Sequence, residues 1–331
     1  MTARVEVPGF RPYVGQHCET VATGSLLRAA GVELSEPMLF GLGEGLGFIF
    51  INLSTLPLPF VGGRTPPFAL TSALCANLGV ECDSRETSSK PKAWDAIETP
   101  LRDGRPVGLQ LDCFHLEYFS QPVHFAGHFV ATYGFDEREL LLVDTAQQGT
   151  KQRASRASVE KARFAKGPMA AKARAWTIAP PPKKPDLRAA VRRAIAANAK
   201  AYLSPPFKGA SYLGIRKLAA SLPKWMKLAK RPRHDLALAA TLMERAGTGG
   251  SLFRNFYRDF LAAALEVGGR KPELVEARDS LAASAEAWAG VAASVMESGR
   301  SASVAPLEAA SAACLRIADL EVAAMKKLAA A

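Results

Sequence analysis

Apolar residues recur at helical spacing directly after a polar loop near the start of the chain. The loop is Gly15-Gln16-His17-Cys18-Glu19-Thr20. One apolar face then follows, made by Val21, Leu26, Leu27 and Ala30. This spacing predicts a helix over residues 18–30, with Cys18 at or near its N-terminus. The helix dipole and the free backbone N–H groups at such a position favour the thiolate, which is the nucleophilic form of cysteine.

Two later stretches read as the strands of a hairpin. Residues 128–134 and 140–144 are mostly apolar, and a polar turn, Asp136-Glu137-Arg138-Glu139, separates them. Folding about this turn brings His128 and Asp144 to neighbouring rungs. An imidazole beside a carboxylate is the base and orienting group that a cysteine nucleophile needs. The sequence therefore predicts Cys18, His128 and Asp144 as catalytic residues. The alternative is a buried structural thiol, an ordinary strand histidine and an aspartate that ends a strand.

The rest of the first half alternates between helical and extended patterns. Helices are predicted over 69–78, 90–103 and 158–164, and strands over 80–83, 106–112 and 175–178. A nucleophile helix followed by an antiparallel sheet that bears the base is the arrangement of a papain-like fold. A glycine-rich stretch, Phe40–Phe48, interrupts this half. It does not match G-x-G-x-x-G, because Leu46 and Phe48 stand where the last glycine is required.

Close backbone approach explains glycines at such density, beside either a substrate or another strand. Gly43 and Gly45 are therefore candidate substrate-binding residues. Glu44 is the only charge of the stretch; it binds a substrate amine or simply faces water. For an oxyanion at Cys18, the candidate donors are its own backbone N–H and the Gln16 side chain.

A run of prolines, Ala179-Pro180-Pro181-Pro182-Lys183-Lys184-Pro185, marks the clearest domain boundary. Beyond it the composition changes to alanine, leucine and charge. Helices are predicted over 186–202, 209–220, 234–246, 251–267, 272–298 and 302–329. We thus expect an α+β protein, with a papain-like cysteine peptidase-type domain over residues 1–180 and an all-α domain over 181–331.

One stretch of the helical half contains two arginines just after a glycine-rich break, Gly247–Gly250. Arg254 and Arg258 lie one turn apart. The functional interpretation is a pocket for an anion or a partner at a helix N-terminus. The alternative is a helix–helix corner where these arginines pair with Glu244 and Asp259.

The formal net charge is +11, and it is unevenly distributed. Between Lys183 and Arg233 there are 14 Lys and Arg against one acid, Asp186. Such a segment attracts acidic partners, or is a solvated surface. Nucleic acid is not expected as a partner, because no zinc-finger, RNP or basic-zipper pattern is present and aromatic residues do not alternate with the basic ones.

The five cysteines are odd in number and irregularly spaced, so reduced thiols are expected rather than a disulfide framework. Cys113, His115, His124 and His128 are spaced too loosely to predict a metal site. We expect no cofactor. No apolar run has the length or position of a signal peptide or a membrane span, so a soluble, cytoplasmic protein is expected, without stable membrane insertion.

Together, these motifs resemble the butirosin biosynthesis protein H family. The resemblance lies in Gly15–Cys18, Phe40–Phe48, Gly127–Val130 and Val143-Asp144, and in Gly247–Gly250 with Phe253-Arg254. It implies a papain-like cysteine acyltransferase accompanied by a helical domain. One departure is that Thr145 follows Asp144, where related cysteine peptidase folds often have Asp-Pro.

The founding member of that family moves an aminoacyl group from an acyl-carrier-protein thioester to an aminoglycoside amine. The resemblance therefore implies an acidic acyl carrier protein as donor and a small-molecule amine as acceptor, in a biosynthetic pathway. Two alternatives stay open: a cysteine hydrolase, peptidase or amidase, with the same three residues, and a non-catalytic binding protein on this fold. A homodimer is one option for its assembly.

Overall fold

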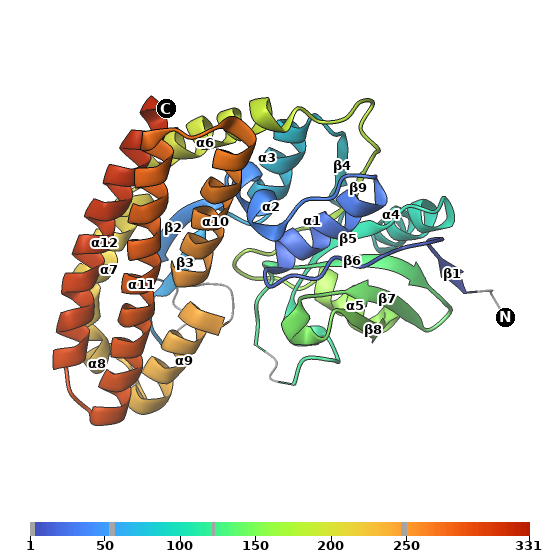
Figure 1. Ribbon diagram of the computed structural model, residues 1–331. Coiled ribbons are helices and arrows are strands. Elements are labelled where there is room, and N and C mark those ends of the chain that lie inside the picture. Colours follow the sequence, from blue (N-terminus) through green and yellow to red (C-terminus); the bar gives the residue numbers. More distant parts are fainter. Residues whose placement is uncertain (1–3, 53–56, 121–122, 246–249) are drawn as a thin grey trace. The chain divides into compact units, whose positions relative to one another are not determined.

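The computed structural model describes residues 4–52, 57–120, 123–245 and 250–331. By their contacts these residues form two compact units (Figure 1). The first contains Met1–Leu39 and Pro67–Pro185, and the second contains Phe40–Pro66 and Asp186–Ala331. Residues 40–66 therefore lie in the second unit, although they precede the proline-rich segment by more than a hundred residues of sequence.

The first unit is built on one antiparallel sheet. Its strand order is β4-β9-β5-β6-β7-β8, and a short β1 also pairs with β6. The strands are β1 (Val5–Glu6), β4 (Cys82–Arg85), β5 (Val107–Leu111), β6 (His128–Phe135), β7 (Glu139–Val143), β8 (Lys151–Ser155) and β9 (Ala175–Ile178). Every residue of β5, β6 and β9 is buried, so the centre of the sheet is covered on both faces.

Helices cover this sheet. They are α1 (Cys18–Ala29), α3 (Ala69–Leu78), α4 (Lys90–Arg102) and α5 (Arg156–Arg163), with short turns η1 (Cys113–His115) and η2 (Ala146–Gln148). α1 packs against β5 and β6 (Figure 1). α4 and α5 bury Ile97 and Val159 against alternate strand residues such as Leu109, Val130 and Leu142. The core thus forms from the period-2 alternation of the strands and the period-3.6 stripe of the helices.

The second unit is helical, apart from one hairpin. Its helices are α6 (Leu187–Leu203), α7 (Ser211–Ser221), η3 (Leu222–Lys224), α8 (Trp225–Leu228), α9 (Pro232–Arg245), α10 (Gly250–Gly268), α11 (Pro272–Ser301) and α12 (Ala305–Ala330). The hairpin pairs β2 (Leu46–Ile51) with β3 (Phe60–Arg64). Phe48 and Val61 of the hairpin share a core with Leu218, Trp288 and Ile317 of the helices. α2 (Glu36–Leu42) leads from the first unit into this hairpin.

The α+β fold class is confirmed: the first unit combines an antiparallel sheet with helices, and the elements described after Asp186 are all helical. The helix at Cys18 begins where the sequence predicts, and the Asp186 side chain caps α6 by accepting a bond of 3.1 Å from the N–H of Ala189. The sequence pattern missed α2, α8, β1, β3 and β8. β8, Lys-Gln-Arg-Ala-Ser, is polar because it is the last strand of the order β4-β9-β5-β6-β7-β8 and only one of its residues is buried. Among the described residues, no helix is long and apolar enough to cross a membrane.

Candidate active site

Cys18 is the first residue of α1 and is half-buried. His17 precedes it with extended backbone angles (φ −106°, ψ 126°) and provides no side-chain cap. The backbone N–H groups of the first helical turn have no acceptor within the helix. The sulfur therefore lies where free N–H groups and the positive end of the helix dipole stabilise negative charge.

A partly buried carboxylate holds the loop that precedes Cys18. Glu36 accepts the backbone N–H groups of Gln16 and His17 at 2.9 Å and the hydroxyl of Thr20 at 2.8 Å. Burial raises the pKa of Glu36, although these three donors oppose the rise. Gly15 packs so closely that a Cβ atom there would lie 2.7 Å from a Glu36 oxygen. The glycine thus permits the carboxylate to approach the nucleophile loop.

The same loop is hydrogen-bonded to the segment that follows Asp144. The backbone N–H of Ala146 donates to the carbonyl oxygen of Gly15 at 2.8 Å. Ala146 follows Asp144 by two residues, so the segments before Cys18 and after Asp144 are held together.

His128 and Asp144 meet as the hairpin register requires. Ala131 pairs with Val143, so extending the register by one residue places Asp144 diagonally from His128 on the same face of the sheet. Nε2 of His128 lies 2.8 Å from Oδ2 of Asp144. Both side chains are buried, and Asp144 is 0% exposed.

Tyr118, which the sequence did not single out, binds the same carboxylate. Its hydroxyl donates to Oδ2 of Asp144 at 2.8 Å, while the backbone N–H of Thr145 donates to Oδ1 at 2.6 Å. Burial and the neighbouring charge of Asp144 raise the pKa of Tyr118 far above its usual range, so the phenol keeps its proton as a donor. The edge of the Phe119 ring packs against His128, with centroids 5.4 Å apart. Nothing in the local sequence distinguishes Tyr118 from any other aromatic loop residue.

The charges around His128 favour its protonated form. Burial by itself lowers the pKa of His128, but the charges of Asp144 and Cys18 and hydrogen bonds to both raise it well above its usual value. Because Nε2 is bonded to Asp144, Nδ1 is the nitrogen that remains for the Cys18 sulfur. The structure thus brings together all three sequence-predicted catalytic residues. An imidazolium held between a carboxylate and a thiol is suited to keep the thiol as a thiolate.

Models of known families match almost the whole chain. The model described as "Butirosin biosynthesis protein H, N-terminal" matches residues 17–145, and a domain of unknown function (DUF4872) matches residues 157–328. The chain belongs to the butirosin biosynthesis protein H family. The first match spans Cys18, His128 and Asp144, and the second spans α6 to α11 and most of α12.

Among curated proteins, none matches this member of the butirosin biosynthesis protein H family. Among solved structures, it is similar to the peptidase domain of Streptococcus ComA, a bifunctional ABC transporter involved in a quorum-sensing pathway. The identity is 15% and the TM-score is 0.33; the match covers 51% of this chain and 98% of that domain.

The other predicted site residues have different surroundings. Gln16 is exposed, and only its backbone N–H is bonded to Glu36. Gly43, Glu44 and Gly45 belong to the second unit and form the turn that ends α2, with Glu44 in a left-handed conformation at φ 51°. A role for these three residues in binding substrate stays a prediction.

Glycines of this stretch permit close packing. A Cβ at Gly41 would lie 1.9 Å from Phe260, and a Cβ at Gly47 would lie 3.0 Å from the backbone of Arg64 in β3. Close approach to another strand, one of the two expected explanations, therefore holds for Gly47.

Arg254 is paired with a buried carboxylate of the protein itself. The guanidinium is 0% exposed, and it donates to both oxygens of Glu321 on α12 at 2.7 and 2.8 Å and to the carbonyl of Gly63 on β3 at 2.9 Å. Tyr202 and Ser284 also donate to Glu321. The interpretation of Arg254 as part of a pocket for an external anion is therefore wrong. This side chain joins α10, α12 and β3 within the second unit.

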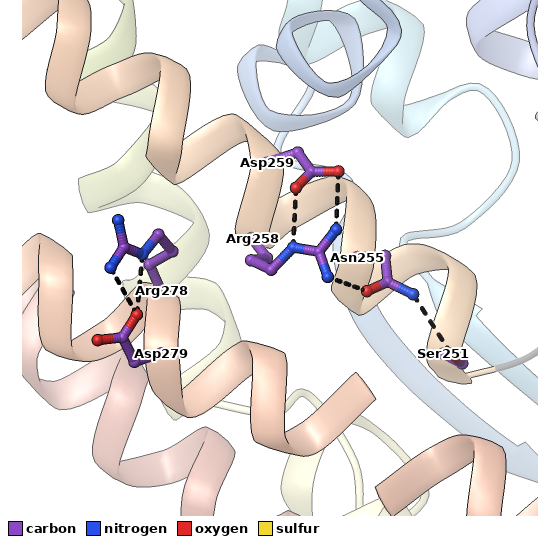
Figure 2. A network of polar contacts seen from close by, with 6 residues as sticks. All are labelled: Ser251, Asn255, Arg258, Asp259, Arg278 and Asp279. Carbon is purple, nitrogen blue, oxygen red and sulfur yellow. Dashed lines mark hydrogen bonds and ion pairs between the residues drawn. The ribbon is translucent and has the colours of Figure 1, made fainter. Parts of the chain in front are cut away.

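Arg258 lies one turn further along α10 and is partly exposed (Figure 2). It donates to both oxygens of Asp259, at 2.8 and 3.1 Å, and to Oδ1 of Asn255 at 2.6 Å. The pairing with Asp259 is the one that the helix-corner alternative predicted. Gly250, the first residue of α10, packs on Trp288, where a Cβ would lie 2.1 Å from the indole. Residues 246–249 of the glycine-rich stretch lie outside the described residues.

One cavity of the first unit has no part in this site. It has a volume of about 510 Å³ and is lined by charged residues of β4, α4 and their surroundings, among them Asp83, Arg85, Lys92 and Asp95. None of Cys18, His128 and Asp144 lines it. We therefore place the candidate active site at these three residues and not at this cavity.

We predict that iodoacetamide labels Cys18 rapidly at pH 6 and that His128→Ala slows this labelling by about 100-fold. The reason is that only about 0.3% of an ordinary thiol is ionised at pH 6, whereas His128 keeps its proton there and holds the thiolate. Intact mass and peptide mapping measure the rate at Cys18 alone. His234→Ala, which removes an exposed histidine of the second unit, is the matched control and should leave the rate unchanged. An ordinary thiol profile indifferent to His128 would show that Cys18 is structural.

We predict that Tyr118→Phe lowers the free energy of unfolding by about 1.5–3 kcal/mol, because Asp144 loses a hydrogen bond to a charged acceptor inside the protein. Urea unfolding measures the change. Tyr257→Phe is the control: its buried hydroxyl has no hydrogen-bond partner among the described residues, so its loss should cost nothing. Equal effects of the two substitutions would mean that the Tyr118–Asp144 bond contributes no stability.

Proposed function

We propose that this protein is a cysteine acyltransferase that moves an acyl or aminoacyl group from a carrier-protein thioester to an amine, forming an amide. The observation that carries the proposal is the buried chain of contacts from Cys18 through His128 to Asp144, at the start of a helix in a butirosin biosynthesis protein H family member. Membership of that family supports a role in biosynthesis.

In the loading step, the Cys18 thiolate attacks the thioester carbonyl. The carbon–sulfur bond to Cys18 forms, and the carrier thiol leaves with a proton from His128. One thioester replaces another, so little free energy is required. The backbone N–H of Cys18 is a donor for the oxyanion, and the exposed Gln16 side chain is a second candidate.

In the transfer step, the amine attacks the acyl-enzyme carbonyl. His128, now neutral, takes the amine proton, and the carbon–sulfur bond to Cys18 breaks to release the amide. Asp144 orients the imidazole through both half-reactions, and Tyr118 and Thr145 fix the carboxylate in turn.

The proposal is tested with N-acetylcysteamine thioesters of acyl and aminoacyl groups. We predict an acyl adduct on Cys18 by intact mass, absent in Cys18→Ser and formed at least 100-fold more slowly in His128→Ala. Adding a primary amine should speed the decay of the adduct and yield an amide. If no thioester of the series loads Cys18 while the amines and thioesters remain intact, the proposal is wrong.

The fate of the adduct separates the transferase from a hydrolase. Release of free acid at the same rate with and without amine would assign the protein to the cysteine hydrolases, which use the same three residues. Product analysis by mass spectrometry distinguishes the acid from the amide.

We further propose that the donor is an acidic acyl carrier protein that docks on the basic segment Lys183–Arg233. All 14 of its Lys and Arg residues are exposed, and Asp186 is its only acid. Charge of one sign over α6, α7 and α8 favours encounter with a partner of the opposite sign.

We predict that Lys224→Glu, Lys227→Glu and Lys230→Glu, combined, raise KM for a carrier-bound donor at least tenfold and leave KM for a small thioester unchanged. Lys326→Glu, an exposed lysine outside the segment, is the control. Raising the salt concentration should weaken only the carrier-bound reaction, because exposed charges are screened. Equal effects on both donors would rule out docking at these residues.

A further inference from the structure

Three metal-ligating side chains gather in the first unit, outside the catalytic triad. Asp112 follows β5, His115 ends η1, and His124 precedes β6. One ligand atom from each lies within 4.8 Å of the other two. The loose sequence spacing of His115 and His124 predicts no metal site, and nothing in the sequence points to Asp112 as a ligand.

Backbone N–H groups fix the orientation of the Asp112 carboxylate. It is 2% exposed, and its Oδ1 accepts the N–H groups of Phe114 at 3.1 Å and Phe125 at 2.8 Å. Its Oδ2 lies 2.9 Å from Nδ1 of His124. Backbone donors of this kind orient metal-binding carboxylates.

The two imidazoles approach the carboxylate from different segments. The rings of His115 and His124 are 5.9 Å apart between centroids, and Phe114 stacks on His124 at 3.8 Å. The carbonyl of His115 accepts the hydroxyl of Ser158 at 2.5 Å, which fixes its backbone, while the ring nitrogens of His115 make no hydrogen bond within the described residues. The His124 side chain is 67% exposed, so a cation can enter from solvent.

The distances between the three ligand atoms are close to those that a small, borderline cation requires. Ligand bonds of about 2.0–2.1 Å in a tetrahedral site separate the ligand atoms by roughly 3.3 Å. The Asp112–His124 contact is already shorter than this, and the His115 ligand atom lies within 4.8 Å of the other two, so binding requires His115 to move closer. Two imidazoles and one carboxylate are donors that suit Zn²⁺ and Co²⁺.

We propose that Asp112, His115 and His124 bind a divalent transition-metal cation of the Zn²⁺ class. This site is structural rather than catalytic. Its ligands flank the segment that carries Tyr118 and Phe119, which contact Asp144 and His128. A cation joins the two ends of that segment, so it steadies the donors around the triad. The proposal does not depend on acyl transfer.

Co²⁺ titration of the metal-free full chain, without an affinity tag, tests the site in a Cys18→Ser background that removes the half-buried nucleophile. We expect one Co²⁺ per chain, with visible absorption bands typical of low coordination number. His115→Ala should weaken binding at least tenfold. It is the sharpest variant, because it leaves the Asp112–His124 hydrogen bond intact. His124→Ala should weaken binding as much.

His234→Ala is the matched control. His234 also contacts a buried aspartate, with Nδ1 3.0 Å from Oδ1 of Asp235, but it belongs to no three-ligand cluster among the described residues. Its loss should leave Co²⁺ affinity unchanged. Circular dichroism verifies that each variant folds.

Hydrogen exchange gives a second readout. Zn²⁺ should slow exchange in residues 113–120, and His115→Ala should abolish this protection. Affinity that is unchanged in both His115→Ala and His124→Ala, or the absence of binding at 100-fold molar excess of Co²⁺, would overturn the proposal. Asp112 and His124 would then be a hydrogen-bonded pair only.

Discussion

The carboxylate of Asp144 is the constraint around which the first unit is arranged. An ionised carboxylate removed from water costs several kcal/mol unless it is fully paired and hydrogen-bonded. Three groups meet this cost: the His128 imidazole, the Tyr118 hydroxyl and the Thr145 N–H. They come from a strand, a loop and the residue next to Asp144 itself. Each must keep its place, so one buried charge fixes the imidazole and the loop that surrounds it.

A second, partly buried carboxylate plays a similar part at the nucleophile loop. Glu36 accepts three donors of the loop and first turn around Cys18, and the Gly15 carbonyl joins that loop to Ala146. Hydrogen bonds from the backbone N–H groups of Gln16 and His17 to Glu36, and from Ala146 to Gly15, therefore hold the backbone next to the Cys18 sulfur in place. Such preorganisation is what a nucleophile needs if it is to meet its base in one geometry.

The second unit relies on the same device. Arg254 and Glu321 are both 0% exposed, and each is bonded to further groups, so the pair leaves neither charge unsatisfied. The pair joins helices 67 residues apart in sequence and ties them to the β2–β3 hairpin. A buried pair of this kind disfavours other packings of the helices, because they would leave a charge buried and unpaired.

The sequence by itself determined the local elements of this protein and the chemistry they carry. Helical spacing located the start of α1 at Cys18, and a polar turn between two apolar runs predicted the hairpin that begins at His128 and ends next to Asp144. A register shift between Thr132 and Gly134 decides the face, because the register at the turn alone would place Asp144 opposite Ala131 and on the other face of the sheet from His128. Tertiary structure decided the rest: Glu36 on the nucleophile loop, Tyr118 on Asp144, Glu321 as the partner of Arg254, and Asp112 beside two histidines. The contacts of Glu36, Tyr118 and Arg254 join residues 16 to 67 positions apart. The contact between Asp112 and His124 is shorter in sequence, but it joins residues on either side of a loop. Periodicity reports only which face of an element is buried, whereas the partner on that face is set by how the elements pack.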